Sequence, residues 1–353
     1  MDANIAATLS HLRGPADRWR PHVKTAKLDF TMKRLLERGV TRFKCATSLE
    51  LLSACEAGAE DVVVAYPLHG AGARRVRQIA ESFPNVRISA LVEAREQVDA
   101  WVGGAVGLFV DINPGMDRTG IDQARDADIV SLVRSVGDRG LSFRGLHYYD
   151  GQLASPSLED REAEAHRGYD RLMAIAATVE ASGATIEEVI TSGTPALPCA
   201  LSYSPFESAS FVHRVSPGTV VYNDLTSLSQ LPVDYGYRPA ALVLATVVSR
   251  PSPGKVTCDA GHKTVSADAG IPTCAVVGRP DLRPGHPSEE HLPIEVPEGV
   301  DVPALGESLL LIPRHVCPTV NNFDHALLVS GGRVLGVETV TARGREHPLP
   351  QRS

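Results

Sequence analysis

The sequence lacks the segments that mark membrane and secreted proteins. No apolar run approaches the about 20 residues that a membrane-spanning helix needs, and Met1–Asn4 leads into a mixed amphipathic segment instead of a signal peptide. The net charge of −7 disfavours nucleic acid or an anionic membrane as a partner. These absences predict a cytoplasmic protein with neither of those partners.

Cysteine and lysine are both scarce, and no two cysteines form a Cys-x-x-Cys pair. The cysteines are Cys45, Cys55, Cys199, Cys258, Cys274 and Cys317. This spacing suits free thiols in a reducing compartment, most of them buried, with Cys317 as the exception. Few amines could form a Schiff base, because the lysines are only Lys24, Lys27, Lys33, Lys44, Lys255 and Lys263.

Residues 1–225 alternate short β-branched runs with longer amphipathic segments. Strands are expected near 43–46, 61–65, 86–92, 107–112, 143–149 and 188–191, and helices over 28–38, 48–57, 74–83, 124–138 and 158–182. Repeated strand–helix units imply a parallel sheet, and about eight units favour a closed (β/α)8 TIM-type barrel. Functional groups of such a barrel lie at the carboxyl ends of its strands.

Residues 226–353 have a different character. Strand-like runs near 240–249, 255–260, 273–277, 308–312 and 334–341 are separated by Gly and Pro turns, and no helix is expected between them. This half is predicted to be an antiparallel β-domain. The chain therefore reads as an α/β barrel followed by a smaller β-domain.

Lys24 ends the short extended stretch Arg20-Pro21-His22-Val23-Lys24-Thr25. Arg20 and His22 lie at alternate positions and can share one face of a strand with Lys24. A partly desolvated lysine beside other cations can form a Schiff base with a carbonyl compound. The alternative is an ordinary solvated loop lysine.

Two polar segments follow predicted strands. Arg118 lies in Asp111–Gly120, where a guanidinium suits a planar anion or makes a surface salt bridge. In Gly145–Gln152, two tyrosines, a histidine and an aspartate are more polar groups than a core strand tolerates unpaired. Tyr149 and, less directly, His147 are the candidate functional residues there.

Two further loops suit a phosphate. Thr191–Pro195 and Val215–Asp224 combine small residues with hydroxyls, so that backbone N–H groups can close on an anion. Barrels often hold phosphate after their last strands. The candidates are Gly193, Thr194, Gly218 and Thr219.

His315 and Cys317 are candidate metal ligands in the β-domain. Residues i and i+2 of an extended segment point the same way, so both side chains could bind one ion. Imidazole with thiolate favours zinc over magnesium or manganese. A buried pair without metal is the alternative.

Taken together, these segments resemble the D-serine dehydratase and D-threonine aldolase family, which shares the alanine-racemase-like barrel. The likeness covers almost the whole chain. It implies pyridoxal 5′-phosphate bound through Lys24, and Zn2+, with Mn2+ as the alternative, at His315 and Cys317. The residues implied to hold the cofactor are Lys24, Arg118, Tyr149, Gly193, Thr194, Gly218 and Thr219.

The resemblance implies a lyase that acts on a small D-3-hydroxy amino acid. The aldolase branch usually has aspartate where Cys317 stands, so a dehydratase giving a keto acid and ammonia is expected, with D-serine or D-threo-3-hydroxyaspartate as substrate. Retro-aldol cleavage to glycine and an aldehyde is the alternative. Racemisation leaves the metal pair without a task, and a non-enzymatic carrier would need only the barrel.

The resemblance also implies a homodimer. Lys263, within a segment that matches the family, is the rival Schiff-base residue, and His291 is either a residue that supports the site or a loop histidine. Relatives usually begin with a short strand before the first helix, whereas this sequence begins inside that helix. The β-domain is therefore expected to lack a strand, or the natural chain to start earlier.

Overall fold

The computed structural model describes residues 1–154 and 157–346, which fall into two compact units. The barrel unit comprises residues 9–24, 29–218 and the segment from Gly344. The β unit comprises residues 1–8, 25–28 and 219–343. Each unit has its own sheet, and each is described separately below.

The barrel unit is built on a curled parallel sheet with the order β1-β2-β3-β4-β6-β7-β8, to which β5 adds beside β4. Its strands are β1 (Arg42–Cys45), β2 (Asp61–Pro67), β3 (Arg87–Val92), β4 (Gly107–Asn113), β5 (Ile121–Asp122), β6 (Phe143–Tyr148), β7 (Glu188–Thr191) and β8 (Val212–Val215). Successive strands pair in sequence order because a helix connects almost every pair, as parallel pairing requires. The predicted strands are confirmed, and β5 and β8 were missed.

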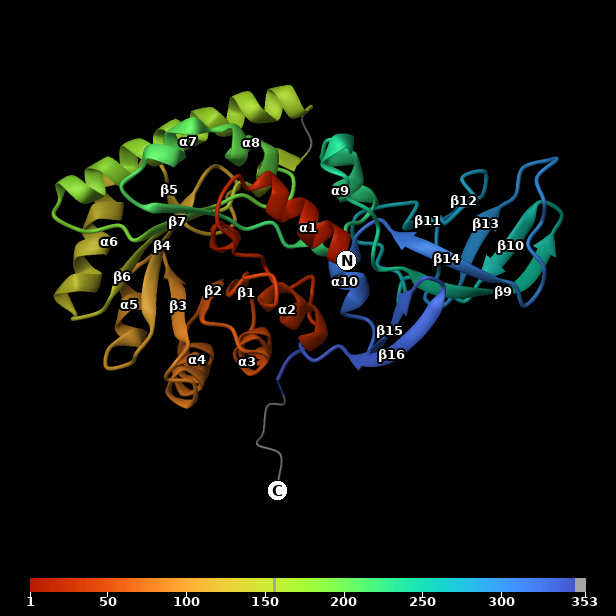
Figure 1. The fold of residues 1–353 in the computed structure, drawn as a ribbon, viewed down its shortest axis with the longest axis horizontal. Coiled ribbons are helices and arrows are strands. Elements are labelled where there is room, and N and C mark those ends of the chain that lie inside the picture. The colour runs from red at the N-terminus through yellow and green to blue at the C-terminus, as the bar shows by residue number, and fades with distance from the viewer. Residues whose placement is uncertain (155–156, 347–353) are drawn as a thin grey trace, which may run out of the picture. The chain divides into compact units, whose positions relative to one another are not determined.

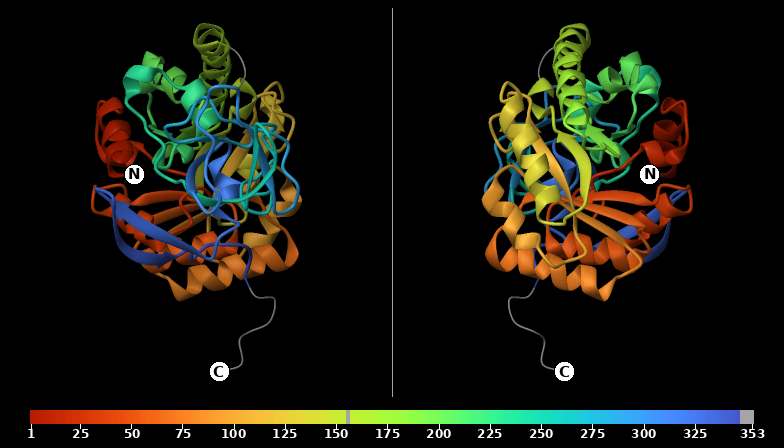
Figure 2. Two further views of the ribbon diagram at one scale, coloured as in Figure 1. Left: turned by 90° about the vertical axis from the view of Figure 1, so that its right-hand side faces the viewer. Right: turned by 90° about the vertical axis from the view of Figure 1, so that its left-hand side faces the viewer.

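Helices cover the outer face of this sheet (Figures 1 and 2). They are α2 (Asp29–Leu36), α3 (Ser48–Ala57), α4 (Gly70–Ser82), α5 (Arg95–Val98), α6 (Asp126–Asp138), α7 (Leu158–Ala181) and α8 (Leu197–Ser202). Local signals fix the ends of α3: the Thr47 side chain accepts from the Glu50 N–H, and Gly58 ends the helix at φ 105°. The five helices predicted for this half are confirmed.

The extended segment from Trp19 to Val23 closes the barrel. It forms parallel bridges with both edge strands of the sheet, Trp19 with Val215 and His22 with Lys44. The Arg20 N–H donates to the Val215 carbonyl at 2.9 Å, and the Val23 N–H to the Lys44 carbonyl at 2.8 Å. With this segment between β8 and β1, the predicted (β/α)8 barrel is confirmed.

Arg20 anchors the closing segment from inside the barrel. Its side chain is fully buried. Two of its nitrogens donate to Glu188 at 2.7 and 2.8 Å, and a third donates to Asp61 at 2.8 Å. Burial alone would raise the pKa of Asp61, but the charge and hydrogen bond of Arg20 lower it. Because Glu188 begins β7 and Asp61 begins β2, one side chain ties the closing segment to two strands.

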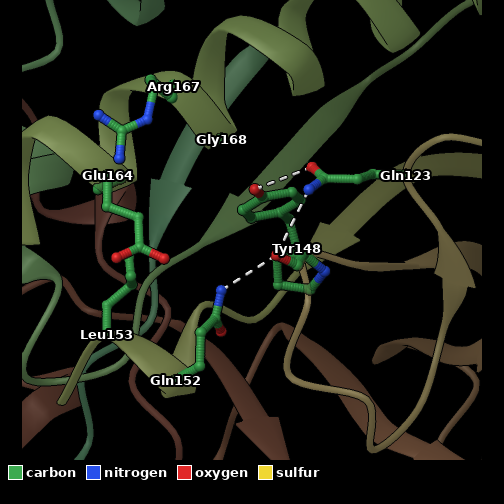
Figure 3. Close-up of a pocket in the computed structure, with 9 residues that line it drawn as sticks. Gln123, Tyr148, Gln152, Leu153, Glu164, Arg167 and Gly168 are labelled. Atoms are coloured by element: carbon green, nitrogen blue, oxygen red, sulfur yellow. Dashed lines mark hydrogen bonds between the residues drawn. The ribbon is translucent and has the colours of Figure 1, made fainter. Parts of the chain in front are cut away.

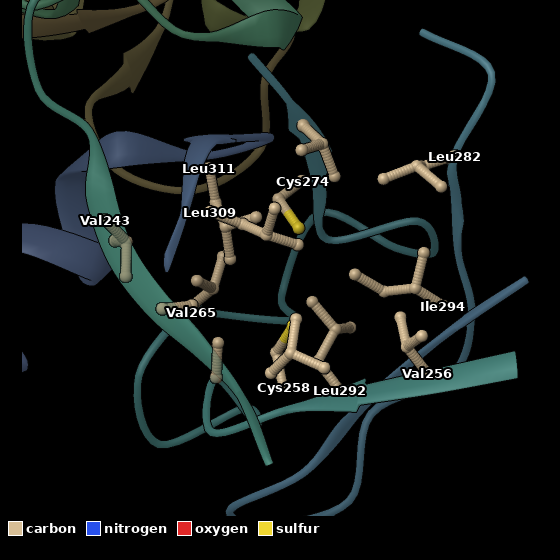
Figure 4. Packing of buried hydrophobic residues seen from close by; sticks show 14 of the residues in the cluster. Val243, Val256, Cys258, Val265, Cys274, Leu282, Leu292, Ile294, Leu309 and Leu311 are labelled. Carbon is tan, nitrogen blue, oxygen red and sulfur yellow. The ribbon is translucent and has the colours of Figure 1, made fainter. Parts of the chain in front are cut away.

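The β unit contains an antiparallel sheet with the order β11-β14-β9-β10-β13-β12. These strands are β9 (Val243–Ser252), β10 (Lys255–Cys258), β11 (Cys274–Val276), β12 (Arg283–Pro284), β13 (Leu292–Glu295) and β14 (Ser308–Pro313). Buried aliphatic side chains, among them Val256, Ile294 and Leu311, fill one contiguous core (Figure 4). The predicted antiparallel β-domain is confirmed.

Other elements of the chain are shorter. A separate hairpin joins β15 (His325–Ser330) to β16 (Arg333–Thr339). The helix α1 (Asp2–His11) begins the sequence. The expectation that no helix follows residue 226 was wrong, since α10 (Val316–Val320) lies there and α9 (Leu225–Gln230) begins at its boundary. Among the described residues, no helix is long and apolar enough to cross a membrane.

The buried ion cluster predicts an unequal response of two neighbouring glutamates. Glu188→Gln leaves the Arg20 guanidinium short of a carboxylate inside the protein, and breaking a buried pair in this way costs about 3–5 kcal/mol of unfolding free energy. Glu187→Gln is the control, because Glu187 pairs with Arg87 and Arg144 at the surface and such pairs contribute at most about 1 kcal/mol. Urea denaturation followed by circular dichroism measures both. Equal losses would contradict this account of Arg20.

Candidate active site

Lys24 lies at the end of the segment that closes the barrel. Its side chain is half-buried, and its backbone N–H donates to the His22 Nδ1 at 3.2 Å. Arg20 lies deeper along the same segment, with its carboxylate partners at the starts of β2 and β7. The charge of Lys24 acts on a different cation, Lys44 of the neighbouring strand β1.

Lys44 is a site residue that the sequence analysis did not single out. It lies on β1 with only 2% of its surface exposed. Its Nζ lies 3.4 Å from the His147 Nε2. Burial and the charge of Lys24 lower the pKa of Lys44 to about 7, against the pull of Asp150 and Asp111. Two features of the sequence could have indicated Lys44: lysine is scarce in this chain, and Lys44 lies within an apolar strand.

His147, which contacts Lys44, in turn contacts Asp111 on a neighbouring strand. His147 lies on β6 and Asp111 on β4, and their side chains meet at 2.7 Å between Nδ1 and Oδ1. Both residues are buried. Burial and the Lys44 charge lower the pKa of His147, although Asp111 opposes them. The neutral imidazole that results can donate from Nδ1 to Asp111 and accept at Nε2 from Lys44.

Tyr149 follows β6 and carries two cations against its ring. The Arg118 guanidinium lies 4.8 Å from the ring centroid, and the Lys44 Nζ lies 5.6 Å from it. Both distances suit cation–π attraction. Arg118 is exposed and Tyr149 is half-buried. The structure therefore brings Arg118, Tyr149 and the Lys44 amine together at the carboxyl ends of the strands.

The loop after β7 presents unused hydroxyls. The Ser192 Oγ and Thr194 Oγ1 are buried and have no hydrogen-bond partner, although buried hydroxyls are normally paired. Ser192 also has a φ of 57°, a conformation that costs energy and concentrates at functional sites. Two such orphan donors beside Gly193 fit an oxygen-rich anion such as a phosphate.

Asp150 holds the loop after β7 in place through hydrogen bonds. Its carboxylate accepts from the Gly193 N–H at 3.2 Å and from the Tyr169 hydroxyl at 2.6 Å. Burial raises the pKa of Asp150 to about 6, although these two hydrogen bonds lower it. A Cβ added at Gly193 would lie 3.0 Å from the Tyr149 ring. Gly193 therefore lets the loop and the ring approach each other.

Gly218 follows β8 and lies against the segment that carries Lys24. A Cβ at this position would lie 2.3 Å from the His22 carbonyl oxygen, a distance that real side chains do not tolerate. Glycine is therefore required for the β8 loop to pack beside His22. Together with the orphan hydroxyls, this packing fits a site for a phosphate-bearing cofactor in the barrel unit.

Cys317 is the half-buried cysteine, while the other five are buried, and all six are free thiols, as predicted. In the β unit its Sγ lies 2.9 Å from the Thr25 Oγ1 and 3.7 Å from the Thr219 Oγ1. Thr25 and Thr219 are the residues that follow Lys24 and Gly218 in the sequence. Thr219 thus contacts the sulfur of a candidate metal ligand within its unit.

His315 is paired with both a carboxylate and the thiol. Its Nδ1 lies 2.6 Å from the Asp268 Oδ2. Burial lowers the pKa of His315, but the hydrogen bonds and charges of Cys317 and Asp268 raise it to about 9. Our expectation that His315 and Cys317 lie on one extended segment was wrong. His315 precedes α10, and Cys317 lies in its first turn, because the Asp224 carboxylate accepts from the Val316 N–H at 2.9 Å.

The donor set fits zinc with two protein ligands. Asp268 engages the Nδ1 of His315, so Nε2 is the ring nitrogen that would bind a metal, in the way that carboxylates orient metal-bound histidines. In the described ranges, no group of three or more His, Cys, Asp or Glu side chains could hold a metal. A zinc ion at His315 and Cys317 would thus keep open positions, as catalytic rather than structural zinc does.

The remaining candidates lie at the surface of the β unit. The Lys263 amine is exposed and bonded to Glu289 at 2.6 Å and Glu290 at 3.1 Å, which disfavours it as a Schiff-base residue. His291 is also exposed. In the barrel unit, a pocket of about 250 Å3 beside α7, lined in part by Gln123, Tyr148 and Gln152 (Figure 3), contains no predicted site residue.

Comparison with known proteins identifies the family. The model of the alanine racemase N-terminal domain matches residues 1–225, and that of a putative serine dehydratase domain matches residues 240–329. The chain belongs to the alanine racemase-like family. The two matches together confirm the predicted membership of its D-serine dehydratase and D-threonine aldolase branch, and the protein is a pyridoxal-phosphate-dependent lyase.

Similar proteins cover nearly the whole chain. A D-threonine aldolase from Arthrobacter sp is 28% identical, over 97% of this chain and 90% of its own. The crystal structure of D-threonine aldolase from Filomicrobium marinum has 27% identity and a TM-score of 0.87, covering 97% and 92%. The D-threo-3-hydroxyaspartate dehydratase from Delftia sp. HT23 has 19% identity and a TM-score of 0.81, covering 98% and 95%.

The tight packing at Gly218 predicts a selective effect on cofactor binding. In Gly218→Ala the new methyl group pushes the β8 loop from His22, so the affinity for pyridoxal phosphate should fall at least about tenfold, or about 1.4 kcal/mol. Gly137→Ala is the control, since a Cβ there meets nothing within 4 Å and α6 should gain stability. Cofactor-free protein titrated with pyridoxal phosphate by absorbance gives the affinities. Unchanged affinity in Gly218→Ala would remove this loop from the cofactor site.

Proposed function

We propose that the protein is a zinc-dependent dehydratase that converts a D-3-hydroxy amino acid to a keto acid and ammonia, with D-serine or D-threo-3-hydroxyaspartate as substrate. The observation that carries this choice is the pair of His315 and Cys317, in which a thiol stands beside an imidazole already oriented by Asp268. The lyase class itself follows from the family.

Residues of the barrel unit would hold the cofactor. The Lys24 amine would bind its aldehyde carbon, and the hydroxyls of Ser192 and Thr194 would donate to its phosphate. Gly193 and Gly218 leave the backbone room to approach it. Bound pyridoxal phosphate supplies an electron sink for the bond that breaks at the substrate Cα.

Lys24 would also move the proton of the first chemical step. The Lys24 amine, when not bonded to the cofactor, would be the base that takes the Cα proton of the substrate. Arg118 stands nearby over the Tyr149 ring, where a guanidinium suits the substrate carboxylate. Asp150 keeps the Gly193 loop in position through its hydrogen bond to the Gly193 N–H.

His315 and Cys317 would hold the metal that assists the leaving hydroxyl. A zinc ion held by these two residues would supply Lewis acidity toward the substrate 3-oxygen. Asp268 would keep the imidazole in the orientation that presents Nε2 to the ion. Loss of water then leaves an enamine that hydrolyses to the keto acid and ammonia.

A histidine and a cysteine at the same spacing support dehydration. Solved variants of D-threo-3-hydroxyaspartate dehydratase replace a histidine and a cysteine that lie two positions apart, and the cysteine variant is in the metal-free form. His315 and Cys317 have this spacing. The resemblance described above gives aspartate, not cysteine, as the usual aldolase residue here.

Retro-aldol cleavage to glycine and an aldehyde is the alternative, and the overall likeness favours it. The Arthrobacter D-threonine aldolase matches 97% of the chain. In that reaction the same site would remove the proton from the 3-hydroxyl, and the Cα–Cβ bond would break instead. Lys24, the phosphate loops and the metal pair would keep their roles in both reactions. Identifying the products therefore distinguishes the dehydratase from the aldolase.

The homodimer and the cytoplasmic location remain predictions. One feature supports the homodimer. The β15–β16 hairpin exposes apolar side chains, including Leu327, Val329 and Leu335, each at least 55% exposed. An isolated two-stranded hairpin is marginally stable, and a second copy of the chain would cover these side chains.

The products of two substrates test the proposed reaction. Purified protein with pyridoxal phosphate and zinc should form pyruvate and ammonia from D-serine, and should form little glycine from D-threonine. Chelation should abolish turnover because the Lewis acid is lost, and zinc should restore it. Keto acid and glycine are quantified in parallel. Glycine and acetaldehyde from D-threonine as the main products would establish the aldolase instead.

A second test concerns the amine that binds the cofactor. Lys24→Ala should remove the covalent attachment, which borohydride reduction and peptide mass spectrometry detect, and should lower turnover at least about 10³-fold. Lys263→Ala, with its exposed amine, is the matched control and should keep both. Attachment that survives Lys24→Ala and is lost in Lys263→Ala would move the role to Lys263.

A further inference from the structure

Lys44 is a buried amine whose function the proposed reaction leaves open. Lysine is almost never fully buried unless it is paired, yet Lys44 is 2% exposed and makes no ion pair with a carboxylate of the described residues. Its polar contact is the His147 Nε2 at 3.4 Å. A position so costly in desolvation needs a use for the amine.

The surroundings of Lys44 are the site itself. Lys24 and Arg118 repel its positive charge, and Asp111 and Asp150 attract it. The Tyr149 ring lies 5.6 Å from its Nζ. The Lys44 amine therefore lies among the residues predicted to hold the cofactor.

Three side chains form one continuous hydrogen-bonded line. The Lys44 Nζ meets the His147 Nε2 at 3.4 Å, and the His147 Nδ1 meets the Asp111 Oδ1 at 2.7 Å. All three residues are buried on strands of one sheet, His147 and Asp111 on the paired strands β6 and β4, and Lys44 on β1. The second Asp111 oxygen has no hydrogen-bond partner, so the carboxylate has capacity left to stabilise a positive charge on the ring.

We propose that Lys44, His147 and Asp111 hold one mobile proton between them and exchange it with the Lys24 amine. The proposal rests on the role of Lys24 given above. Lys44 is the acid–base end, and His147 and Asp111 are positioning residues. In the step, the line begins with Asp111 ionised and with Lys44 and His147 both neutral, and protonated Lys24 gives its one proton to the Lys44 amine. The reverse transfer restores both groups, so the count of protons is unchanged.

Charge balance explains why the line holds one proton. With Asp111 ionised and one extra proton on either Lys44 or His147, the three side chains have no net charge. A second proton would leave a net positive charge, buried beside Lys24 and Arg118, which the low-dielectric interior disfavours. The lowered pKa of both Lys44 and His147 agrees with this balance.

Nuclear magnetic resonance of the holoenzyme tests the relay without substrate. Lysine labelled with 13C at the ε-carbon gives few signals, since the chain has few lysines, and Lys44→Met and Lys255→Met assign two of them. The Lys44 signal should titrate near pH 7, whereas exposed Lys255 should titrate near 10.4. The His147 ring signals should move over the same pH interval, because the two groups share a proton.

Two carboxylate variants complete the test. Asp111→Asn removes the attraction of the carboxylate and should lower the Lys44 midpoint by at least about one pH unit, as expected for a close charge. Asp138→Asn, at the exposed end of α6, is the matched control and should leave it unchanged. The pH profile of kcat should shift with the Lys44 midpoint in the Asp111 variant.

Either of two results would overturn the relay. One is a Lys44 midpoint above about 9. The other is a Lys44 midpoint near pH 7 that does not change in Asp111→Asn, together with His147 ring signals that do not move over that pH interval. This result would make Lys44 an isolated buried amine. The wild-type titration needs no substitution in the relay, so a variant that fails to fold leaves the test intact. Because no substrate is present, failure of the relay is separate from failure of the dehydratase assignment.

Discussion

The barrel depends on one buried guanidinium. Arg20 binds the first residues of β2 and β7 through Asp61 and Glu188 while its own backbone pairs with β8. Such a cluster is stable only when every charge is matched, since an unpaired buried ion costs several kcal/mol. The ion pairs of Arg20 with Asp61 and Glu188 therefore fix the position of the closing segment inside the barrel. In this position the segment brings Lys24 to the carboxyl ends of the strands.

The two ends of the barrel use charge in opposite ways. Around Arg20 the carboxylates are held close and ionised, which favours rigidity. At the other end, cations outnumber their partners: Lys24, Lys44 and Arg118 stand near Asp111 and Asp150. An excess of positive charge at a partly buried site is unfavourable in the protein alone and becomes favourable when an anionic ligand binds. The positive charge of the site therefore favours binding of a phosphate and a carboxylate.

Local signals in the sequence predicted most of the barrel, and contacts between distant residues account for what was missed. Thr47 and Gly58 bound α3 by capping chemistry that three or four residues contain, so its predicted range was correct. The turn of α10 at Cys317 depends on Asp224, far away in the sequence, and no local pattern reveals it. Lys44 looked like an ordinary strand lysine, because its partners His147 and Asp111 lie on other strands. Motifs thus predicted candidate residues, but not which buried groups share charge.

The barrel is closed by the same short segment that ends in Lys24, the lysine proposed to bind the cofactor. Backbone hydrogen bonds to β8 and β1 and the Arg20 cluster hold this seam shut. A ligand covalently attached to Lys24 and held by loops after β7 and β8 ties the seam to the strands on one side of it. Occupancy by the cofactor and integrity of the barrel are then one linked equilibrium. Cells short of the vitamin would lose the folded enzyme along with its activity.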